Sequence, residues 1–237
     1  MQRLPLVPIT LLAAASFTNA QQPARPDLTA YEAGFARWEP AIAAFEGLDH
    51  ATPDPEGAVL LVGSSSIRLW KSAAEDLKPY PVIQRGYGGA KFCDVAHFAP
   101  RIVTPHRFRA TVVFVGNDIV GGAADKTPEE VARLFGYLAD LLRSHQPEAP
   151  VICCDVRPAP SRFKAWDKIR LGNAALKAAC EQREGVHYLD TSDAFLVEGG
   201  DAARADLYGP DRLHLNEAGY AVWSAQIKSE IDRVLGE

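Results

Sequence analysis

Long apolar runs, basic clusters and metal-binding patterns are scarce in this chain, and each shortage excludes a class of protein. Beyond the first residues, no apolar run approaches the roughly 20 residues that a membrane-spanning helix needs. The 237 residues carry a formal charge of -5 and no cluster of Lys and Arg, so we expect no membrane span and no nucleic-acid partner. No His/Cys spacing of the zinc type occurs either. The remaining composition, 47% hydrophobic and 23% charged, is that of a globular protein.

The beginning of the chain differs in composition from the rest. Arg3 is the only charge in residues 1–20, an apolar run follows it, and Thr-Asn-Ala ends the stretch. This pattern is typical of a secretory signal peptide, with an uncleaved N-terminal helix as the alternative. We therefore expect a secreted or periplasmic protein in which residues 21–26 form a disordered lead-in and residues 27–237 fold as one domain.

Cysteine is used only four times, at Cys93, Cys153, Cys154 and Cys180. An exported protein can form disulfides, because they persist outside the reducing cytoplasm. Cys153 and Cys154 are neighbours in a predicted strand, so their side chains should point to opposite faces of the sheet, and at most one of them is well placed to reach Cys180. Small buried apolar side chains are an equally good interpretation, and the sequence leaves the choice open.

Short β-branched runs alternate with longer helical patterns from residue 58 onward. The predicted strands are 58–62, 81–84, 111–115, 151–156 and 186–189. Such alternation predicts a parallel sheet with crossover helices on its faces. We expect an α/β fold: a three-layer α/β/α sandwich of the flavodoxin-like type, whose five parallel strands have the order 2-1-3-4-5.

Four helical patterns accompany these strands. One begins at the capping-box-like Thr29-Ala-Tyr-Glu and runs toward Phe45. A second has Thr127 as its N-cap and Pro128 at the first helical position, and should end near residue 144. The other two span about 166–181 and about 216–235.

Polar and glycine-rich sequences follow the first three predicted strands, at the sheet edge where folds of this type bind ligands. After the first strand comes Gly63-Ser64-Ser65-Ser66, a tight turn that can present a serine at a helix N-terminus, near N–H groups that favour an oxyanion. The next two loops contain Arg85-Gly-Tyr-Gly-Gly89 and Gly116-Asn117-Asp118. Taken singly, these sequences are equally typical of a helix cap, a phosphate-binding turn or an ordinary glycine turn.

The most specific pattern lies near the C-terminus, in Asp211-Arg-Leu-His214. A spacing of three lets the Asp carboxylate fold back onto His Nδ1, which fixes the tautomer and leaves Nε2 free to take a proton from a serine. A surface turn that caps the last helix is the alternative.

Together the four loops resemble the SGNH hydrolase superfamily, also called GDSL esterases, over essentially the whole chain from Ala58. That family carries Ser, Gly, Asn and His in four sequence blocks on a flavodoxin-like fold. The resemblance implies that Ser65 is the nucleophile, that His214 is its base and that Asp211 orients the histidine. It implies no metal and no organic cofactor.

The same resemblance implies an oxyanion hole made by the backbone N–H groups of Ser65 and Gly89 and by the Asn117 amide. Two positions depart from the family pattern. Ser64 stands where the family usually has Asp, which leaves the other two serines of the triplet as lesser candidates for the nucleophile. Val115 stands where the family usually has Gly, and we expect only a local adjustment of the backbone there.

The implied activity is that of a serine esterase that hydrolyses carboxylic esters through an acyl-enzyme. Export and the lack of a large apolar lid segment favour a short, acetyl-like acyl group, and exported relatives often act on carbohydrates, so a saccharide or other small-molecule ester is the expected substrate. The alternatives are a lipase or acylhydrolase on lipid esters, a non-catalytic carbohydrate-binding relative, and a phosphate-ester hydrolase. For the last, Arg68 and Arg85 are the nearby cations. The oligomeric state is left open.

Overall fold

The computed structural model describes residues 23–237, so the predicted signal peptide and residues 21–22 lie outside it. Its centre is one sheet of five parallel strands in the order β2-β1-β3-β4-β5. The strands are β1 (Val59–Gly63), β2 (Val82–Gly86), β3 (Ala110–Phe114), β4 (Val151–Cys154) and β5 (Val186–Leu189). The predicted order and direction are confirmed, and no strand boundary differs from its predicted position by more than two residues.

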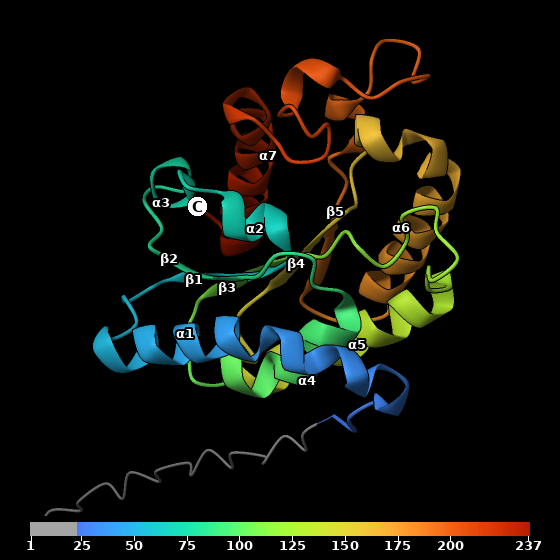
Figure 1. Cartoon of the computed structure of the whole chain (residues 1–237). Coiled ribbons are helices and arrows are strands. Elements are labelled where there is room, and N and C mark those ends of the chain that lie inside the picture. The colour runs from blue at the N-terminus through green and yellow to red at the C-terminus, as the bar shows by residue number, and fades with distance from the viewer. Residues whose placement is uncertain (1–22) are drawn as a thin grey trace, which may run out of the picture.

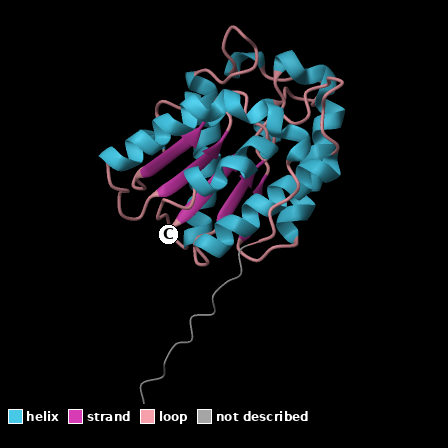
Figure 2. Cartoon of the chain, turned by 60° about the horizontal axis from the view of Figure 1, so that its bottom comes forward, coloured by secondary structure: helices cyan, strands magenta, loops and turns pink. Residues whose placement is uncertain are grey.

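Helices cover both faces of this sheet (Figures 1 and 2), which confirms the three-layer prediction. One face packs against α2 (Ser65–Leu69), α3 (Ala73–Asp76) and α7 (Glu217–Leu235). The other packs against α1 (Glu39–Ala51), α4 (Phe92–Ile102), α5 (Pro128–His145) and α6 (Trp166–Glu181). Because both faces are covered, all five residues of β1 and of β3 are buried, which accounts for their largely apolar sequences.

The three later predicted helices agree with the structure to within one residue. Thr127 caps α5 as predicted, since its side chain accepts a hydrogen bond from the backbone N–H of Glu130 at 3.2 Å. Asn216 caps α7 in the same way by accepting from Gly219 N at 2.9 Å. None of the helices within residues 23–237 is both long and apolar enough to cross a membrane.

The predicted N-terminal helix is wrong in its first turns. Residues Thr29–Trp38 form a 3-10 helix, η1, and α1 begins only at Glu39 and continues to Ala51. No capping box forms at Thr29, because its backbone N–H donates to the Asp27 side chain at 2.9 Å and the 3-10 helix has no side-chain cap. Pro40, which lacks an N–H, occupies the first turn of α1 and suits its start.

Three further 3-10 helices lie in the second half of the chain: η2 (Pro160–Ala165), η3 (Ser192–Phe195) and η4 (Ala205–Leu207). Before η1, residues 23–26 form no regular secondary structure, although the Arg25 guanidinium lies 2.7 Å from His97 Nδ1.

All four cysteines are buried free thiols. Cys153 belongs to the core on the α6 face of the sheet, together with Cys180, whereas Cys154 belongs to the core on the α7 face. The prediction that these neighbours point to opposite faces is therefore confirmed. Burial raises the pKa of the Cys153 thiol well above its usual value, so the group is held as a neutral, core-filling side chain.

The carboxyl end of β1 passes exceptionally close to β3. Gly63 has a φ of 150°, and a Cβ atom on it would lie 1.9 Å from the carbonyl oxygen of Phe114. Immediately after it, Ser64 N donates to the same Phe114 oxygen at 2.9 Å, and Tyr87 N donates to the carbonyl oxygen of Gly63 at 3.1 Å. Only glycine fits at this junction, because any side chain would separate the two strands.

Gly63→Ala should therefore lower the free energy of unfolding by about 3 kcal/mol or more, because the new Cβ collides with backbone atoms that cannot move aside. Gly34→Ala is the matched control, since no heavy atom lies within 4 Å of the corresponding Cβ position. Thermal unfolding of both variants checks this expectation. Equal melting temperatures for the two variants would contradict the close approach of β1 to β3.

Candidate active site

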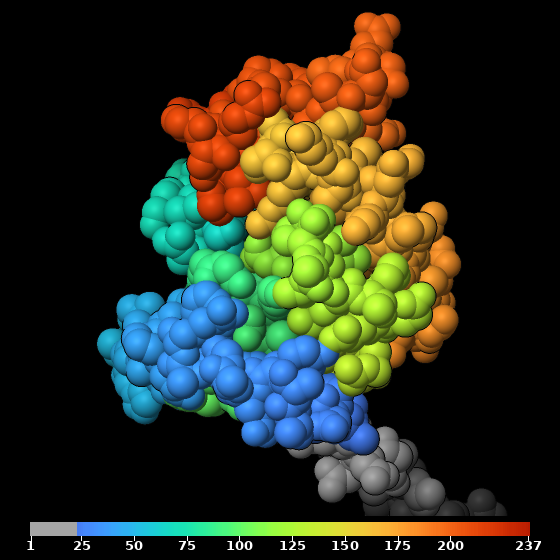
Figure 3. Space-filling model, turned by 45° about the vertical axis from the view of Figure 1, so that its right-hand side comes forward, coloured from blue at the N-terminus to red at the C-terminus, as the bar shows by residue number. Residues whose placement is uncertain are grey.

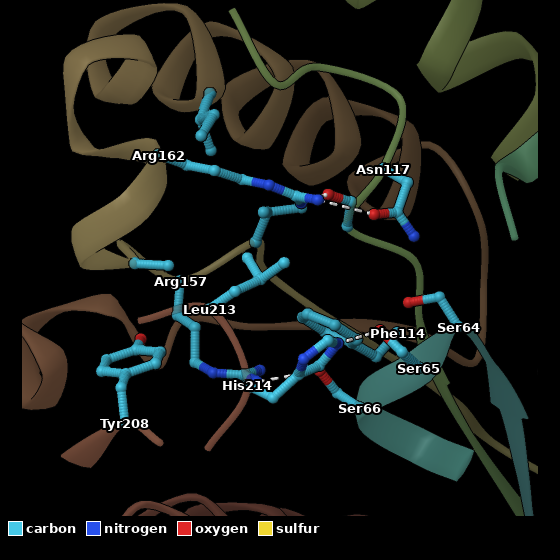
Figure 4. A pocket seen from close by; sticks show the side chains of 14 residues that line it. Ser64, Ser65, Ser66, Phe114, Asn117, Arg157, Arg162, Tyr208, Leu213 and His214 are labelled. Carbon is cyan, nitrogen blue, oxygen red and sulfur yellow. Dashed lines mark hydrogen bonds between the residues drawn. The ribbon is translucent and has the colours of Figure 1, made fainter. Parts of the chain in front are cut away.

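Ser65 and His214 are 149 residues apart in sequence and meet beyond the carboxyl ends of the strands, where Ser65 Oγ lies 2.8 Å from His214 Nε2 (Figure 4). Ser65 is the first residue of α2, directly after the Gly63 junction. Its hydroxyl is thus presented at a helix N-terminus within hydrogen-bond reach of an imidazole.

The imidazole is held from its other side by Asp211. Asp211 Oδ2 lies 2.6 Å from His214 Nδ1, while Oδ1 accepts the backbone N–H groups of Leu213 and His214, each at 3.0 Å. The side-chain hydrogen bond from His214, followed by these backbone bonds, lowers the pKa of the Asp211 carboxyl to about 2. The carboxylate is therefore ionised at neutral pH and requires the proton of the ring on Nδ1, which leaves Nε2 to accept from Ser65.

Backbone hydrogen bonds fix the turn that carries this pair. Gly209 N donates to His214 O at 2.8 Å, and Ser161 N, in η2, donates to Arg212 O at 3.0 Å. Arg212 itself has a φ of 57°, a left-handed conformation that closes the turn. Figure 3 shows the red-orange segment around residue 210 packed against the yellow segment that follows β4. The histidine is thus placed by two segments that are distant in sequence.

The same spacing of acid and histidine recurs at Asp94 and His97, with a different result. In α4, Asp94 accepts the backbone N–H of Lys91 at 2.8 Å as part of a helix cap, and the His97 ring stacks on Phe35 at 3.9 Å between ring centroids. Spacing alone therefore does not make an acid–histidine pair.

The other two serines of the triplet have different neighbours. Ser66 Oγ accepts from Arg157 Nη2 at 2.9 Å, and Ser64 is 1% exposed at the end of β1, where its backbone N–H is bound to Phe114. Only Ser65 of the three is hydrogen-bonded to His214.

Asn117 lies in the wall of the same cavity as Ser65, whereas Gly89 does not belong to that wall. Asn117 Nδ2 donates to the carbonyl oxygen of Ala90, the residue after Gly89, at 3.0 Å. The loops after β2 and β3 are therefore joined at Asn117, a residue of the cavity wall that also contains Ser65. Val115, at the position where glycine was expected, is buried in the core, and the loop still brings Asn117 to the cavity.

The cations of the cavity are not those that the sequence suggested. Arg85 is buried away from it, where it is ion-paired with Asp49 and donates to His106 Nε2 at 3.1 Å, and Arg68 is not part of the cavity wall either. Instead, Arg157 and Arg162 line the cavity. Both follow β4, and the residues after this strand contain no recognisable sequence motif.

Arg157 is a buried cation without an acidic partner among residues 23–237. Its guanidinium lies 4.7 Å from the ring centroid of Phe114 and 4.6 Å from that of Trp223. The residue is 5% exposed, and its Nε and Nη1 have no hydrogen-bond partner in the described structure. The faces of the aromatic rings therefore provide much of what stabilises the charge.

The cavity itself is small. Its volume is about 30 Å³. Its wall includes Ser65, His214, Asn117 and the two arginines. No Asp or Glu belongs to its wall, and residues 23–237 contain no cluster of three His, Cys, Asp or Glu side chains placed to hold a metal ion. The arrangement can deliver a serine hydroxyl, an acceptor for its proton and an amide donor to one small group.

This sheet order and these four loops define the class of the protein, which is the SGNH hydrolase superfamily. Residues 57–222 match the GDSL-like lipase/acylhydrolase family, and the chain therefore belongs to that family.

Among curated proteins, the human platelet-activating factor acetylhydrolase IB subunit alpha2 is 27% identical over 184 residues, which cover 71% of this chain and 73% of that protein. Among solved structures, a GDSL-like lipase from Bacteroides thetaiotaomicron has a TM-score of 0.64 at 21% identity, covering 85% of this chain and 98% of its own. A carbohydrate esterase of family 3 from Talaromyces cellulolyticus has a TM-score of 0.59 at 17% identity, with coverages of 76% and 98%. These structural similarities support the fold, and the family supports an ester-bond hydrolase.

Asp118, next to Asn117, anchors the β3 loop to α4. The residue is 3% exposed, its carboxylate accepts from Phe92 N at 3.0 Å, and Lys126 Nζ lies 3.5 Å away. Burial raises the pKa of the Asp118 carboxyl to about 6, despite the opposing effect of Lys126. When folding raises the pKa of a carboxyl, its protonated form stabilises the fold. This stabilisation is complete at a pH below the pKa of the unfolded state, and it is lost as the pH rises through the pKa of the folded state.

Asp118→Asn should remove this pH dependence, because the amide does not titrate. The stability of the wild type relative to the variant should fall between pH 4 and pH 7, by at most about 1.4 kcal/mol per pH unit. Thermal unfolding across this range measures the difference, with the exposed Asp167→Asn as the control. Parallel curves for wild type and Asp118→Asn would show that burial does not raise the pKa of this carboxyl.

Proposed function

We propose that this chain is an exported serine esterase in which Ser65 attacks the carbonyl carbon of a carboxylic ester. The observation that carries the proposal is the continuous hydrogen-bonded chain from Ser65 Oγ to His214 Nε2 at 2.8 Å and from His214 Nδ1 to Asp211 at 2.6 Å. A helix cap or a phosphate-binding turn would not require this order of groups. Export rests on the signal-peptide pattern of residues 1–20.

In the first step, Ser65 Oγ forms a bond to the carbonyl carbon and its proton passes to His214 Nε2. The negative charge then resides on the former carbonyl oxygen, which the N–H groups of Ser65 and Gly89 and the Asn117 amide would stabilise. The intermediate collapses by breaking the ester C–O bond, and His214 returns the proton to the departing alcohol. Water attacks the acyl-enzyme in the same manner, releasing the acid and restoring Ser65.

The proposed substrate is a short-chain, acetyl-like ester on a carbohydrate. The small cavity beside Ser65 supports a short acyl group. The names of an acetylhydrolase and of a carbohydrate esterase among the similar proteins agree with this substrate class. An acylhydrolase on lipid esters is the second candidate, supported by the lipase/acylhydrolase description of the family.

Ser65→Ala should reduce kcat/KM on p-nitrophenyl acetate by about a thousandfold or more, because within residues 23–237 no other hydroxyl is hydrogen-bonded to His214. The same variant should no longer be labelled by a fluorophosphonate probe. Peptide mapping of the labelled wild type should place the probe on Ser65, and Ser72→Ala, at the surface, serves as the control. Full activity of Ser65→Ala, or a label on Ser64 or Ser66, would overturn the assignment.

Acyl-chain length provides the test of substrate class. We expect kcat/KM to fall at least about tenfold from p-nitrophenyl acetate to p-nitrophenyl octanoate. A longer acyl chain would fit into the small cavity only if the residues of its wall moved apart. Acetylated xylo-oligosaccharides should release acetate, measured directly, at rates comparable to the acetate ester. A preference for the octanoate or for longer chains would instead favour the lipid acylhydrolase.

A further inference from the structure

Arg162 makes two hydrogen bonds to the loop that carries the proposed oxyanion-hole amide. From η2, after β4, its Nη1 donates to the carbonyl oxygen of Gly116 at 2.6 Å, and its Nη2 donates to Asn117 Oδ1 at 2.9 Å (Figure 4). The guanidinium forms no ion pair with any acidic side chain of residues 23–237. Its hydrogen bonds are therefore directed at one short stretch of backbone and one side-chain amide.

The amide of Asn117 can, in principle, lie in two orientations of almost equal shape that differ by exchange of oxygen and nitrogen. An oxyanion at Ser65 is stabilised only if a nitrogen faces it, because an amide oxygen there would repel the negative charge. The orientation must therefore be fixed by groups that can bond to only one end of the amide.

Two such groups flank Asn117. A guanidinium can only donate, so Arg162 must bind the oxygen, and a carbonyl can only accept, so Ala90 must bind the nitrogen. With these bonds made, the second N–H of Nδ2 is left for another acceptor, and Asn117 and Ser65 line the same cavity. Both contacts would become repulsive if the amide turned over.

We propose that Arg162 is a positioning residue that fixes the Asn117 amide with Nδ2 toward the oxyanion formed at Ser65. The proposal rests on the proposed function. Withdrawal of electron density by the adjacent cation also makes Nδ2–H a stronger donor, because linked hydrogen bonds polarise one another. The planar guanidinium suits this task, since its two nitrogens reach two acceptors on adjacent residues at once, whereas the ammonium of lysine is a single point charge.

The test compares Arg162→Ala and Arg162→Lys with Lys164→Ala, an exposed neighbour in η2, on p-nitrophenyl acetate. We expect Arg162→Ala to lower kcat by about 10- to 100-fold with little change in KM, because the affected donor acts mainly in the transition state. Arg162→Lys should lie between this variant and the wild type, and Lys164→Ala should match the wild type. Added guanidinium chloride at non-denaturing concentration should restore part of the kcat of Arg162→Ala.

A double-mutant cycle shows whether the loss of kcat in Arg162→Ala arises through Asn117 or independently of it. If Arg162 acts by orienting the amide, the double variant with Asn117→Ala should be no slower than Asn117→Ala alone. A fully additive loss overturns the proposal, as does a loss confined to KM for esters that carry a carboxylate, which would indicate direct binding of an anionic substrate.

Failure of this inference is distinguishable from failure of the proposed function. If Arg162→Ala and Arg162→Lys keep the wild-type kcat while Ser65→Ala is inactive, the positioning role is wrong and the esterase proposal stands. If Ser65→Ala retains activity, both are wrong. Should Arg162→Ala fail to fold, Arg162→Lys and its cycle with Asn117→Ala provide the same comparison.

Discussion

Three of the four loops at the site depend on how β1 ends. Gly63 is paired with Gly86 of β2 and with Phe114 of β3, and the hydrogen bonds that follow it tie the chain to both neighbours. Ser65 follows Gly63 by two residues. In the neighbouring loops, Gly89 follows Gly86 by three residues and Asn117 follows Phe114 by three. The loops therefore arrive side by side because the strands are in register, and the absence of a side chain at Gly63 permits that register.

The histidine turn reaches the site differently, since no strand of the sheet leads directly into it. It is held by the cap of α7, by its own backbone hydrogen bonds and by η2. Within η2, Ser161 bonds to the histidine turn and Arg162 bonds to the Asn117 loop. This short segment thus connects the proposed base to the proposed oxyanion hole, so a shift in either would be transmitted to the other through two adjacent residues.

Much of this arrangement could be predicted from the sequence, and the parts that could not have physical causes. Strands and long helices followed from local periodicity, and the Asp211–His214 pair from a three-residue spacing. The helix α4 was missed because Pro100 lies in its last turn and breaks the expected pattern. Arg157 and Arg162 were missed because they stand in a proline-containing stretch without a motif, and their contacts to Ser66 and Asn117 span 91 and 45 residues. Contacts at such separations are determined by tertiary packing, which a single sequence does not display.

The two arginines also bear on the electrostatics of the proposed reaction, which forms a negative oxyanion and a positive imidazolium together. Asp211, behind His214, favours the imidazolium, while Arg157 behind Ser66 and Arg162 behind Asn117 favour negative charge in the cavity. Aromatic rings exclude water from Arg157, so its charge is less screened than that of a surface arginine. In the proposed reaction, these charges would stabilise the separated charges of the transition state more than the neutral ester. A chain whose net charge is -5 gives no indication of this local arrangement, because it depends on a few side chains brought together by the fold.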